Sequence, residues 1–372
     1  MRNLKGTLAC LMLLSAAACT GDSPSKKLIY YGWGIRDARY VRHHWSEMES
    51  TPFDGTAISV IGKHNGAGVE QASSDEPLGL GVFGPRALRL EDFESAIEDL
   101  RAARWRRFTD NFIPACLGFE QSQGFTWFDE ARWQVVLANW RLLVTVAKRG
   151  GLRGIILDPE HYAVRLFNHP AMRPGPSTTF ERHRLQVKGR GQQLMMATRA
   201  IYPDITILAL FGHTLALGAF RAGQLEQYEY GLYPAFLDGM LETAAPETHF
   251  VDGFESAYGF KHRGQFQEAR KAIRRDALAL TSNPRLYRER VEVGFGVWLD
   301  HGGQNHWHDA HHSENYFSPA EFRAAITDAL SLSDRYVWIY SQGPRFFPPR
   351  ALPNAYVKAI RAARRRDPNH SG

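Results

Sequence analysis

The pattern that most constrains the fold of this chain is a change of hydrophobic period that recurs along almost its whole length. From residue 27 onward, short runs rich in Val, Ile, Tyr and Phe alternate with longer stretches in which apolar residues recur every three or four positions. Short apolar runs bounded by Gly, Asp or Pro are typical of buried strands, and the longer stretches are typical of amphipathic helices. Repeated alternation of the two predicts a parallel sheet whose strands are joined by crossover helices.

Eight strands are expected, at residues 28–33, 56–61, 108–117, 154–158, 205–211, 250–255, 291–298 and 336–340. The helices predicted between them include residues 91–103, 133–147, 185–201, 265–280 and 320–332. Eight strand–helix units in about 340 residues predict an α/β chain folded as a single (β/α)₈ TIM barrel with extended βα loops, over residues 27–366.

A doubly wound open sheet is the alternative fold. Such sheets often bind dinucleotides at a glycine-rich turn, and three glycines of this chain have a matching spacing. Gly79, Gly81 and Gly84 have the spacing of a dinucleotide-binding turn. That motif requires a strand directly before it and a helix after it. No convincing strand precedes these glycines and Pro85 follows them at once, so a flexible loop after strand two is the preferred interpretation.

The first 18 residues are interpreted as an export signal. Arg2 and Lys5 precede an apolar run, residues 8–14, that is too short to span a bilayer. Small residues follow, and then Cys19, an order that resembles a bacterial lipoprotein signal. The resemblance implies a diacylated Cys19, a tether over residues 19–26, and an exported protein anchored to a membrane and facing the periplasm or cell surface. An ordinary signal peptidase site at residues 16–18 is the alternative.

Cysteine usage and charge exclude two further classes of protein. Cys116 is the one cysteine left in the body of the chain, so an intrachain disulfide framework is excluded. The formal charge falls from +6 to +4 when Arg2 and Lys5 leave with the signal. Much of the remaining excess lies at residues 358–366, which are interpreted as a solvated last helix before a tail at 367–372. A nucleic-acid partner is therefore not expected.

Acidic residues gather where catalytic groups of a (β/α)₈ barrel lie, at the carboxyl ends of the strands. Asp158 and Glu160 end the fourth strand, and because alternate residues of an extended chain share a face, both are expected to point toward the barrel axis. Asp252 and Glu255 end the sixth strand in a similar way. These four are the candidate catalytic residues.

Polar and aromatic side chains at the same strand ends and loops complete the predicted substrate site. They are Tyr31, Trp33, Asp110, His161, Tyr162, Tyr258, Trp298, Asp300, His301, Trp307 and Trp338. This layout resembles the glycoside hydrolases built on the barrel, in architecture over residues 27–366 and without a family signature. The resemblance implies a poly- or oligosaccharide substrate, no cofactor, and a carboxyl pair formed by Asp158 or Glu160 with Glu255 or Asp252 opposite.

Two other functions remain open at this point. A histidine-rich loop follows the seventh strand, with His306, His308, His311 and His312, and could hold zinc in a metal-dependent hydrolase. Barrel metallohydrolases of the amidohydrolase type, however, have a His-x-His at the end of strand one, where this chain has Tyr31 and Trp33. The second alternative is an inactive barrel that only binds glycans.

Overall fold

The computed structural model describes residues 26–62 and 77–365. The predicted export signal with Cys19, almost all of the tether and the tail therefore lie outside the described residues. One sheet has the strand order β10 (Phe295–Trp298), β11 (Tyr336–Ser341), β1 (Lys27–Gly32), β3 (Gly55–Thr56). A second sheet has the order β5 (Phe112–Cys116), β6 (Gly154–Asp158), β7 (Thr206–Ala209), β8 (His249–Asp252), β9 (Val291–Val293).

The two sheets are parts of one closed barrel. A parallel bridge between Ala57 and Phe112 joins the segment after β3 to β5. On the other side, β9 pairs with β8 and β10 pairs with β11, and Gly294 alone separates β9 from β10. The pairings therefore run through eight parallel strands and return to the first, as in a (β/α)₈ barrel. The open-sheet alternative is wrong.

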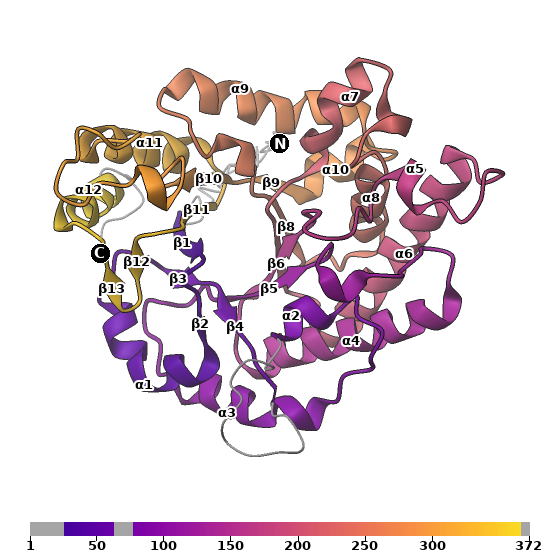
Figure 1. Cartoon of the computed structure of the whole chain (residues 1–372), viewed down its shortest axis with the longest axis horizontal. Coiled ribbons are helices and arrows are strands. Elements are labelled where there is room, and N and C mark those ends of the chain that lie inside the picture. Colours follow the sequence, from indigo (N-terminus) through magenta and orange to yellow (C-terminus); the bar gives the residue numbers. More distant parts are fainter. Residues whose placement is uncertain (1–25, 63–76, 366–372) are drawn as a thin grey trace, which may run out of the picture.

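A helix follows each of the eight strands, and Figure 1 shows these helices surrounding the strands. They are α1 (Ala38–Glu49), α3 (Glu94–Ala102), α4 (Glu130–Arg149), α6 (Phe180–Ile201), α8 (Tyr233–Thr243), α9 (Arg263–Arg274), α11 (Pro319–Leu332) and α12 (Asn354–Arg364). Shorter elements lie in the connections: α2 (Leu78–Gly81), α5 (His169–Met172), α7 (Leu217–Arg221), α10 (Pro284–Arg290), β2 (Arg36–Asp37), β4 (Ile58–Ser59), β12 (Arg345–Phe346) and β13 (Pro349–Arg350). None of the helices in the described ranges is long and apolar enough to cross a bilayer.

Gly79, one of the three glycines with the spacing of a dinucleotide-binding turn, allows close packing of a helix on a strand. A Cβ on Gly79 would lie 1.8 Å from the carbonyl oxygen of Pro114, so only glycine lets α2 rest directly on β5. Contacts between α2 and β5 agree with Figure 1, where α2 lies beside that strand.

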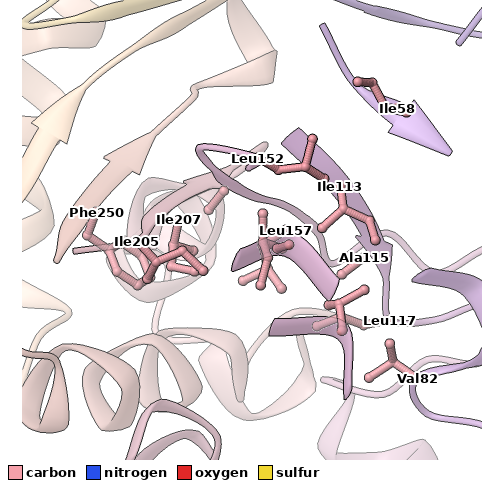
Figure 2. Close-up of a cluster of buried hydrophobic side chains, with 14 of the residues drawn as sticks. Ile58, Val82, Ile113, Ala115, Leu117, Leu152, Leu157, Ile205, Ile207 and Phe250 are labelled. Atoms are coloured by element: carbon pink, nitrogen blue, oxygen red, sulfur yellow. The ribbon is translucent and has the colours of Figure 1, made fainter. Parts of the chain in front are cut away.

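Two apolar layers follow from the two-residue period of the strands. Ile29, Ile156, Leu208 and Val251 point into the barrel and form one buried cluster. Their neighbours along each strand point outward against the helices; Figure 2 shows Leu157, Ile207 and Phe250 in this outer layer. Because Tyr31 follows Ile29 by two residues and Asp158 follows Ile156 by two, both share the inward face where their strands end.

Candidate active site

A single tyrosine hydroxyl links the two carboxyl groups at the end of β6. The Tyr162 hydroxyl lies 2.6 Å from Oε2 of Glu160 and 3.1 Å from Oδ2 of Asp158. The backbone N–H of Glu160 donates to Oδ1 of Asp158 at 3.0 Å, which fixes the turn after the strand. Asp158 is fully buried, Glu160 is half-buried and Tyr162 is exposed. The predicted convergence of Asp158, Glu160 and Tyr162 is thus present in the structure.

The buried position of Asp158 changes its acidity. Burial, and then the negative charge of Glu160, raise the pKa of Asp158 from 3.8 to about 7, although three hydrogen bonds oppose the shift. One of the three comes from the thiol of Cys116, whose Sγ lies 3.5 Å from Oδ2. Near neutral pH, Asp158 is therefore divided between its protonated and ionised forms.

Glu255 is held at the end of β8 by an unusual turn. The preceding residue, Phe254, has φ 40° and ψ 64°, in the left-handed region that side chains other than those of Gly, Asn and Asp rarely occupy. Asp252 stabilises this turn, because its Oδ1 accepts the Phe254 N–H at 3.1 Å. The N–H of Glu255 then donates to the carbonyl of Leu210 at 2.9 Å. These contacts set the direction in which Glu255 leaves the strand.

The carboxyl group of Glu255 lies close enough to the other two for their charges to interact. Burial raises its pKa first, the charges of Glu160 and Asp158 raise it further, and it reaches about 9 despite a hydrogen bond from Tyr258. Its Oε2 is buried and has no hydrogen-bond partner in the described part of the chain. At neutral pH, Glu255 is a neutral acid that faces ionisable carboxyl groups. Asp158, Glu160 and Glu255 are called the carboxyl cluster below.

Aromatic rings form the surroundings of the carboxyl cluster. Tyr258 packs against Trp298, Trp338 and Tyr340, at centroid distances of 5.5, 5.2 and 5.3 Å. Trp338 is fully buried and its indole N–H donates to the carbonyl of Gly253 at 2.9 Å, so this ring forms the floor of the site. Trp33 is 70% exposed, and its side chain is hydrogen-bonded to Tyr340.

Asp300 ties the loops after β10 and β11 together. Its carboxylate accepts the indole N–H of Trp298 at 2.9 Å and the backbone N–H groups of Gln342 and Gly343 at 2.9 and 2.8 Å. With these donors, the buried Asp300 orients the Trp298 ring. His301 lies beside that ring and beside Tyr316, with centroid distances of 5.2 and 4.3 Å, and burial lowers the pKa of His301.

The prediction that Asp110 belongs to the substrate site is wrong. β5 begins at Phe112, so Asp110 lies before the strand, at the opposite end of the barrel from the carboxyl cluster. There its Oδ1 accepts the hydroxyl of Tyr336 at 2.6 Å, and its Oδ2 lies 3.3 Å from Nζ of Lys27. Tyr336 and Lys27 are the first residues of β11 and β1, so Asp110 helps to close the bottom of the barrel.

Asp252 also does not face the mouth as predicted. It shares the outward face of β8 with Phe250, where its Oδ2 lies 3.4 Å from the hydroxyl of Thr214. Burial raises the pKa of Asp252 to about 6, against hydrogen bonds from Phe254 and Gly212 and the nearby His213. Its contacts support the turns after β7 and β8.

Two further predicted substrate contacts have structural partners instead. The indole N–H of Trp307 donates to the carbonyl of Ala351, and its ring packs on Tyr356 of α12 at 4.8 Å. The ring of His161 stacks on Tyr230 at 4.0 Å, and burial lowers the pKa of His161 to about 4. Its Nε2 accepts the N–H of Phe167 at 3.4 Å. Trp307 therefore joins the outer ring, and His161 stabilises the loop that follows Glu160.

The histidine-rich loop provides no metal site in the described parts of the chain. Nδ1 of His308 lies 3.5 Å from Glu314, and Nε2 of His312 lies 2.9 Å from the carbonyl of Asp309. Within residues 26–62 and 77–365, no three His, Cys, Asp or Glu side chains are grouped so that they could hold a metal ion. The predicted alternative ligands, His306 and His311 among them, do not converge.

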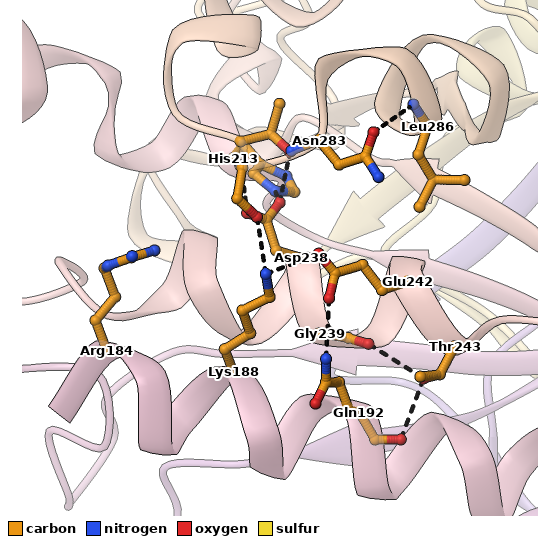
Figure 3. Close-up of polar contacts among 12 residues, drawn as sticks. Arg184, Lys188, Gln192, His213, Asp238, Gly239, Glu242, Thr243, Asn283 and Leu286 are labelled. Carbon is orange, nitrogen blue, oxygen red and sulfur yellow. Dashed lines mark hydrogen bonds and ion pairs between the residues drawn. The ribbon is translucent and has the colours of Figure 1, made fainter. Parts of the chain in front are cut away.

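A buried polar network fastens the loop after β7, and Figure 3 shows it around Asp238 of α8. Asp238 accepts hydrogen bonds from Nε2 of His213 at 2.9 Å, from the Thr281 hydroxyl at 2.6 Å, and from both the N–H and the hydroxyl of Ser282 at 2.7 Å. Burial opposes ionisation of Asp238, but these hydrogen bonds and His213 lower its pKa to about 2. The network connects the loop after β7 and the segment before α10 to α8.

Sequence reasoning missed several residues of the site. Cys116 contacts Asp158 and Tyr340 stacks on Tyr258 at 5.3 Å, yet neither was a predicted site residue. The two-residue period of the strands could have identified them. Cys116 follows the inward-pointing Phe112 by four residues and Tyr340 follows the inward-pointing Trp338 by two, so both are expected on the inward face. Phe254 has no comparable sequence signal.

Comparison with known proteins yields likenesses in structure only. No protein-family model and no curated protein matches the sequence. Among solved structures, a GH18 chitinase from Pseudoalteromonas aurantia aligns with 91% of this chain and 100% of its own, at 13% identity and a TM-score of 0.45. GH5_18 from Streptomyces cattleya, in complex with Manb1-4GlcNAc, aligns with 94% of this chain and 82% of its own, at 16% identity and a TM-score of 0.48. The barrel assignment itself rests on the strand pairings described above.

Proposed function

We propose that this protein is a glycoside hydrolase that cleaves poly- or oligosaccharides with carboxyl groups from the ends of β6 and β8. The observation that supports this most is the carboxyl cluster, in which a neutral Glu255 faces Glu160 and Asp158 at one end of a closed barrel. Glycosidases need one carboxylic acid to protonate the leaving oxygen and one carboxylate to act as nucleophile or base. Groups whose surroundings move their pKa values apart suit this division of work.

Glu255 is the proposed proton donor. Its pKa of about 9 keeps it protonated at neutral pH, so it has a proton to donate, and among the described residues its buried Oε2 has no hydrogen-bond partner to compete for that proton. Glu160 is the proposed nucleophile or base, because it is the more accessible carboxyl group at the end of β6. Asp158 is fully buried, so we assign it a positioning role that acts on Glu160 through Tyr162.

The aromatic side chains supply the proposed sugar contacts. Trp33 offers a largely exposed ring beside Tyr340, which suits a platform for a pyranose. Tyr162 and Tyr258 lie in the same loops as the carboxyl groups, and Tyr31 of β1 and Trp298 of β10 come from other strands around the site. Asp300 acts on the substrate indirectly, through Trp298.

The test replaces each member of the carboxyl cluster by its amide, as Asp158→Asn, Glu160→Gln and Glu255→Gln, and measures hydrolysis across a panel of glycans. General acid–base assistance contributes about 10²–10⁴-fold in rate, so at least two variants should lose activity by that factor. Glu98→Gln, on an exposed position of α3, is the matched control and should keep full activity.

Two outcomes would contradict the proposal. If all three amide variants keep full activity, the chemistry lies elsewhere in the molecule. If the wild-type protein binds glycans but cleaves none of the panel, the protein is a glycan-binding barrel. Thermal melting of each variant, recorded alongside, separates loss of chemistry from loss of fold.

A further inference from the structure

A small apolar cavity lies beside the carboxyl cluster, enclosed by β1, β5, α2 and the segment around β4. Its volume is about 130 Å³, and most of its lining is apolar, with Ile35, Val60, Leu80 and Ile113 among the wall residues. Figure 1 places α2 next to β4 and β5. None of the contacts described so far explains this space.

Two residues belong to the cavity wall and to the site at once. Tyr31 and Cys116 line the cavity. The Cys116 thiol also contacts Oδ2 of Asp158 at 3.5 Å. Tyr31 lies near enough that burial, and then Cys116 and Asp158, raise its pKa. The cavity therefore adjoins the site at Asp158, with Tyr31 and Cys116 between the two.

Size and polarity restrict what the cavity can hold. An apolar cavity of about 150 Å³ stays dry and takes a ligand of benzene size. A pyranose ring would have to bury several hydroxyl groups there, and a buried hydroxyl group without a hydrogen-bond partner is strongly unfavourable. Ser59 and the hydroxyl of Tyr31 are the polar side chains of the lining besides the Cys116 thiol. A compact apolar substituent fits these limits, and a whole sugar does not.

We propose that this cavity is a specificity pocket for a methyl-bearing substituent on the sugar unit bound at the carboxyl cluster. The methyl group can belong to a 6-deoxy sugar or to an acetyl group, since both present the same chemistry to the pocket. The proposal rests on the proposed glycosidase function and narrows its substrate to sugars modified in this way.

The experiment compares substrate pairs that differ only in the methyl-bearing group. One arm pairs N-acetylated with N-formylated oligosaccharides, which keep the neutral amide and lose only the methyl group, and the other pairs 6-deoxy with 6-hydroxy glycosides. One methylene in a hydrophobic pocket is worth about 10–200-fold in kcat/KM, so wild type should prefer the methyl-bearing member of one pair by at least about 10-fold. The arm that shows the preference identifies the source of the methyl group.

Leu80→Phe fills the pocket and should remove that preference, while Leu286→Phe makes the same change on α10 and should retain it. If Leu80→Phe fails to fold, Leu80→Ala enlarges the pocket and should extend the preference from acetyl to propionyl or from methyl to ethyl. Equal kcat/KM for both members of both pairs, or a preference unchanged by every Leu80 variant, would overturn the inference and leave the proposed function intact.

Failure of the proposed glycosidase function gives a different result, because no glycan is then cleaved at all. If no glycan is cleaved, the same substrate pairs are titrated against wild type by calorimetry. Tighter binding of the methyl-bearing member, weakened by Leu80→Phe, supports the pocket without catalysis. Equal binding of both members overturns it.

Discussion

The Tyr162 hydroxyl lies 3.1 Å from Oδ2 of Asp158, although Tyr162 is half exposed and Asp158 is fully buried. The same hydroxyl lies 2.6 Å from Glu160, and a hydroxyl has only one proton to donate. When both carboxyl groups are ionised, Tyr162 can satisfy only one of them. When Asp158 is protonated, it can donate to Tyr162, which then donates to Glu160. The protonation of Asp158 therefore decides how firmly Glu160 is held.

Replacing Tyr162 by Phe tests this relay. The bond from Tyr162 lowers the pKa of Asp158, so Tyr162→Phe should raise that pKa above about 7. We expect the corresponding step of the pH–rate profile to move to higher pH and the rate at neutral pH to fall. Tyr202→Phe removes a hydroxyl bonded to the Leu152 carbonyl, far from the cluster, and serves as the control. A Tyr162→Phe profile identical to wild type would rule out the relay.

Glu255 should make the protein less stable as pH rises. Its folded pKa of about 9 lies above the ordinary glutamate value of 4.5, so the folded state keeps a proton that the unfolded state releases. The stability this group contributes is complete below about pH 4.5 and is lost as pH rises toward 9. Glu255→Gln has no such proton to lose. The melting temperature of Glu255→Gln minus that of wild type should therefore increase by roughly a few degrees between pH 5 and pH 9.

The matched control for this experiment is Glu98→Gln, whose difference from wild type should not change with pH. A constant offset between Glu255→Gln and wild type over the whole range would mean that Glu255 is ionised in the folded protein. The proposed role of Glu255 as proton donor would then be lost.

The order of strands was predictable because the hydrophobic period changes at each element, and all eight predicted strands are present. Which way a residue points was harder to predict. A parallel strand is buried on both faces, so its apolar residues do not alternate with polar ones. The run that contains Phe250, Asp252 and Glu255 gives no sign that Asp252 points outward. Phe108 is apolar and buried, so the third strand was predicted to begin there, and this wrongly placed Asp110 within the strand.

Of the eight helices that follow the barrel strands, α1 and α8 escaped prediction, for opposite physical reasons. In α1, only Ala38, Val41 and Met48 are buried, among charged and histidine side chains, so the apolar stripe is narrow. In α8, residues 233–241 are all buried, so no polar face marks a helical period. The turn at Phe254 could not be predicted at all, because nothing in the side chain of Phe favours the left-handed conformation.

Chelation should leave activity unchanged. Two of the histidines after β10 contact single partners, His308 with Glu314 and His312 with the carbonyl of Asp309, and the described residues offer no group of ligands for a metal. We expect purified protein to retain its rate after dialysis against EDTA, and elemental analysis to find less than stoichiometric zinc. Zinc bound one to one, with activity lost on chelation and restored by zinc, would replace the carboxyl mechanism with a metal-dependent one.

Cys19→Ser should release the protein from the membrane fraction. The expectation follows from the basic, apolar and small-residue order of residues 1–19, which lie outside the described part of the chain. Fractionation with and without detergent, followed by mass spectrometry of the mature N-terminus, provides the measurement. A wild-type N-terminus without lipid mass, distributed as in Cys19→Ser, would favour an ordinary signal peptidase site.

Asp300→Asn should separate positioning from chemistry. The carboxylate of Asp300 accepts three N–H donors, whereas an amide at the same place has one acceptor oxygen and turns its own N–H₂ toward at least one donor. Leaving buried donors unsatisfied costs about 1–3 kcal/mol, so the free energy of unfolding in urea should fall by that amount. Because the Trp298 ring then loses its fixed orientation, KM should rise while kcat changes little.

Asp276→Asn, the control, breaks the surface pair with Arg221 and should cost less than about 1 kcal/mol, with no effect on KM. A large fall in kcat for Asp300→Asn, at unchanged KM, would instead place Asp300 among the groups that act on the reacting bond.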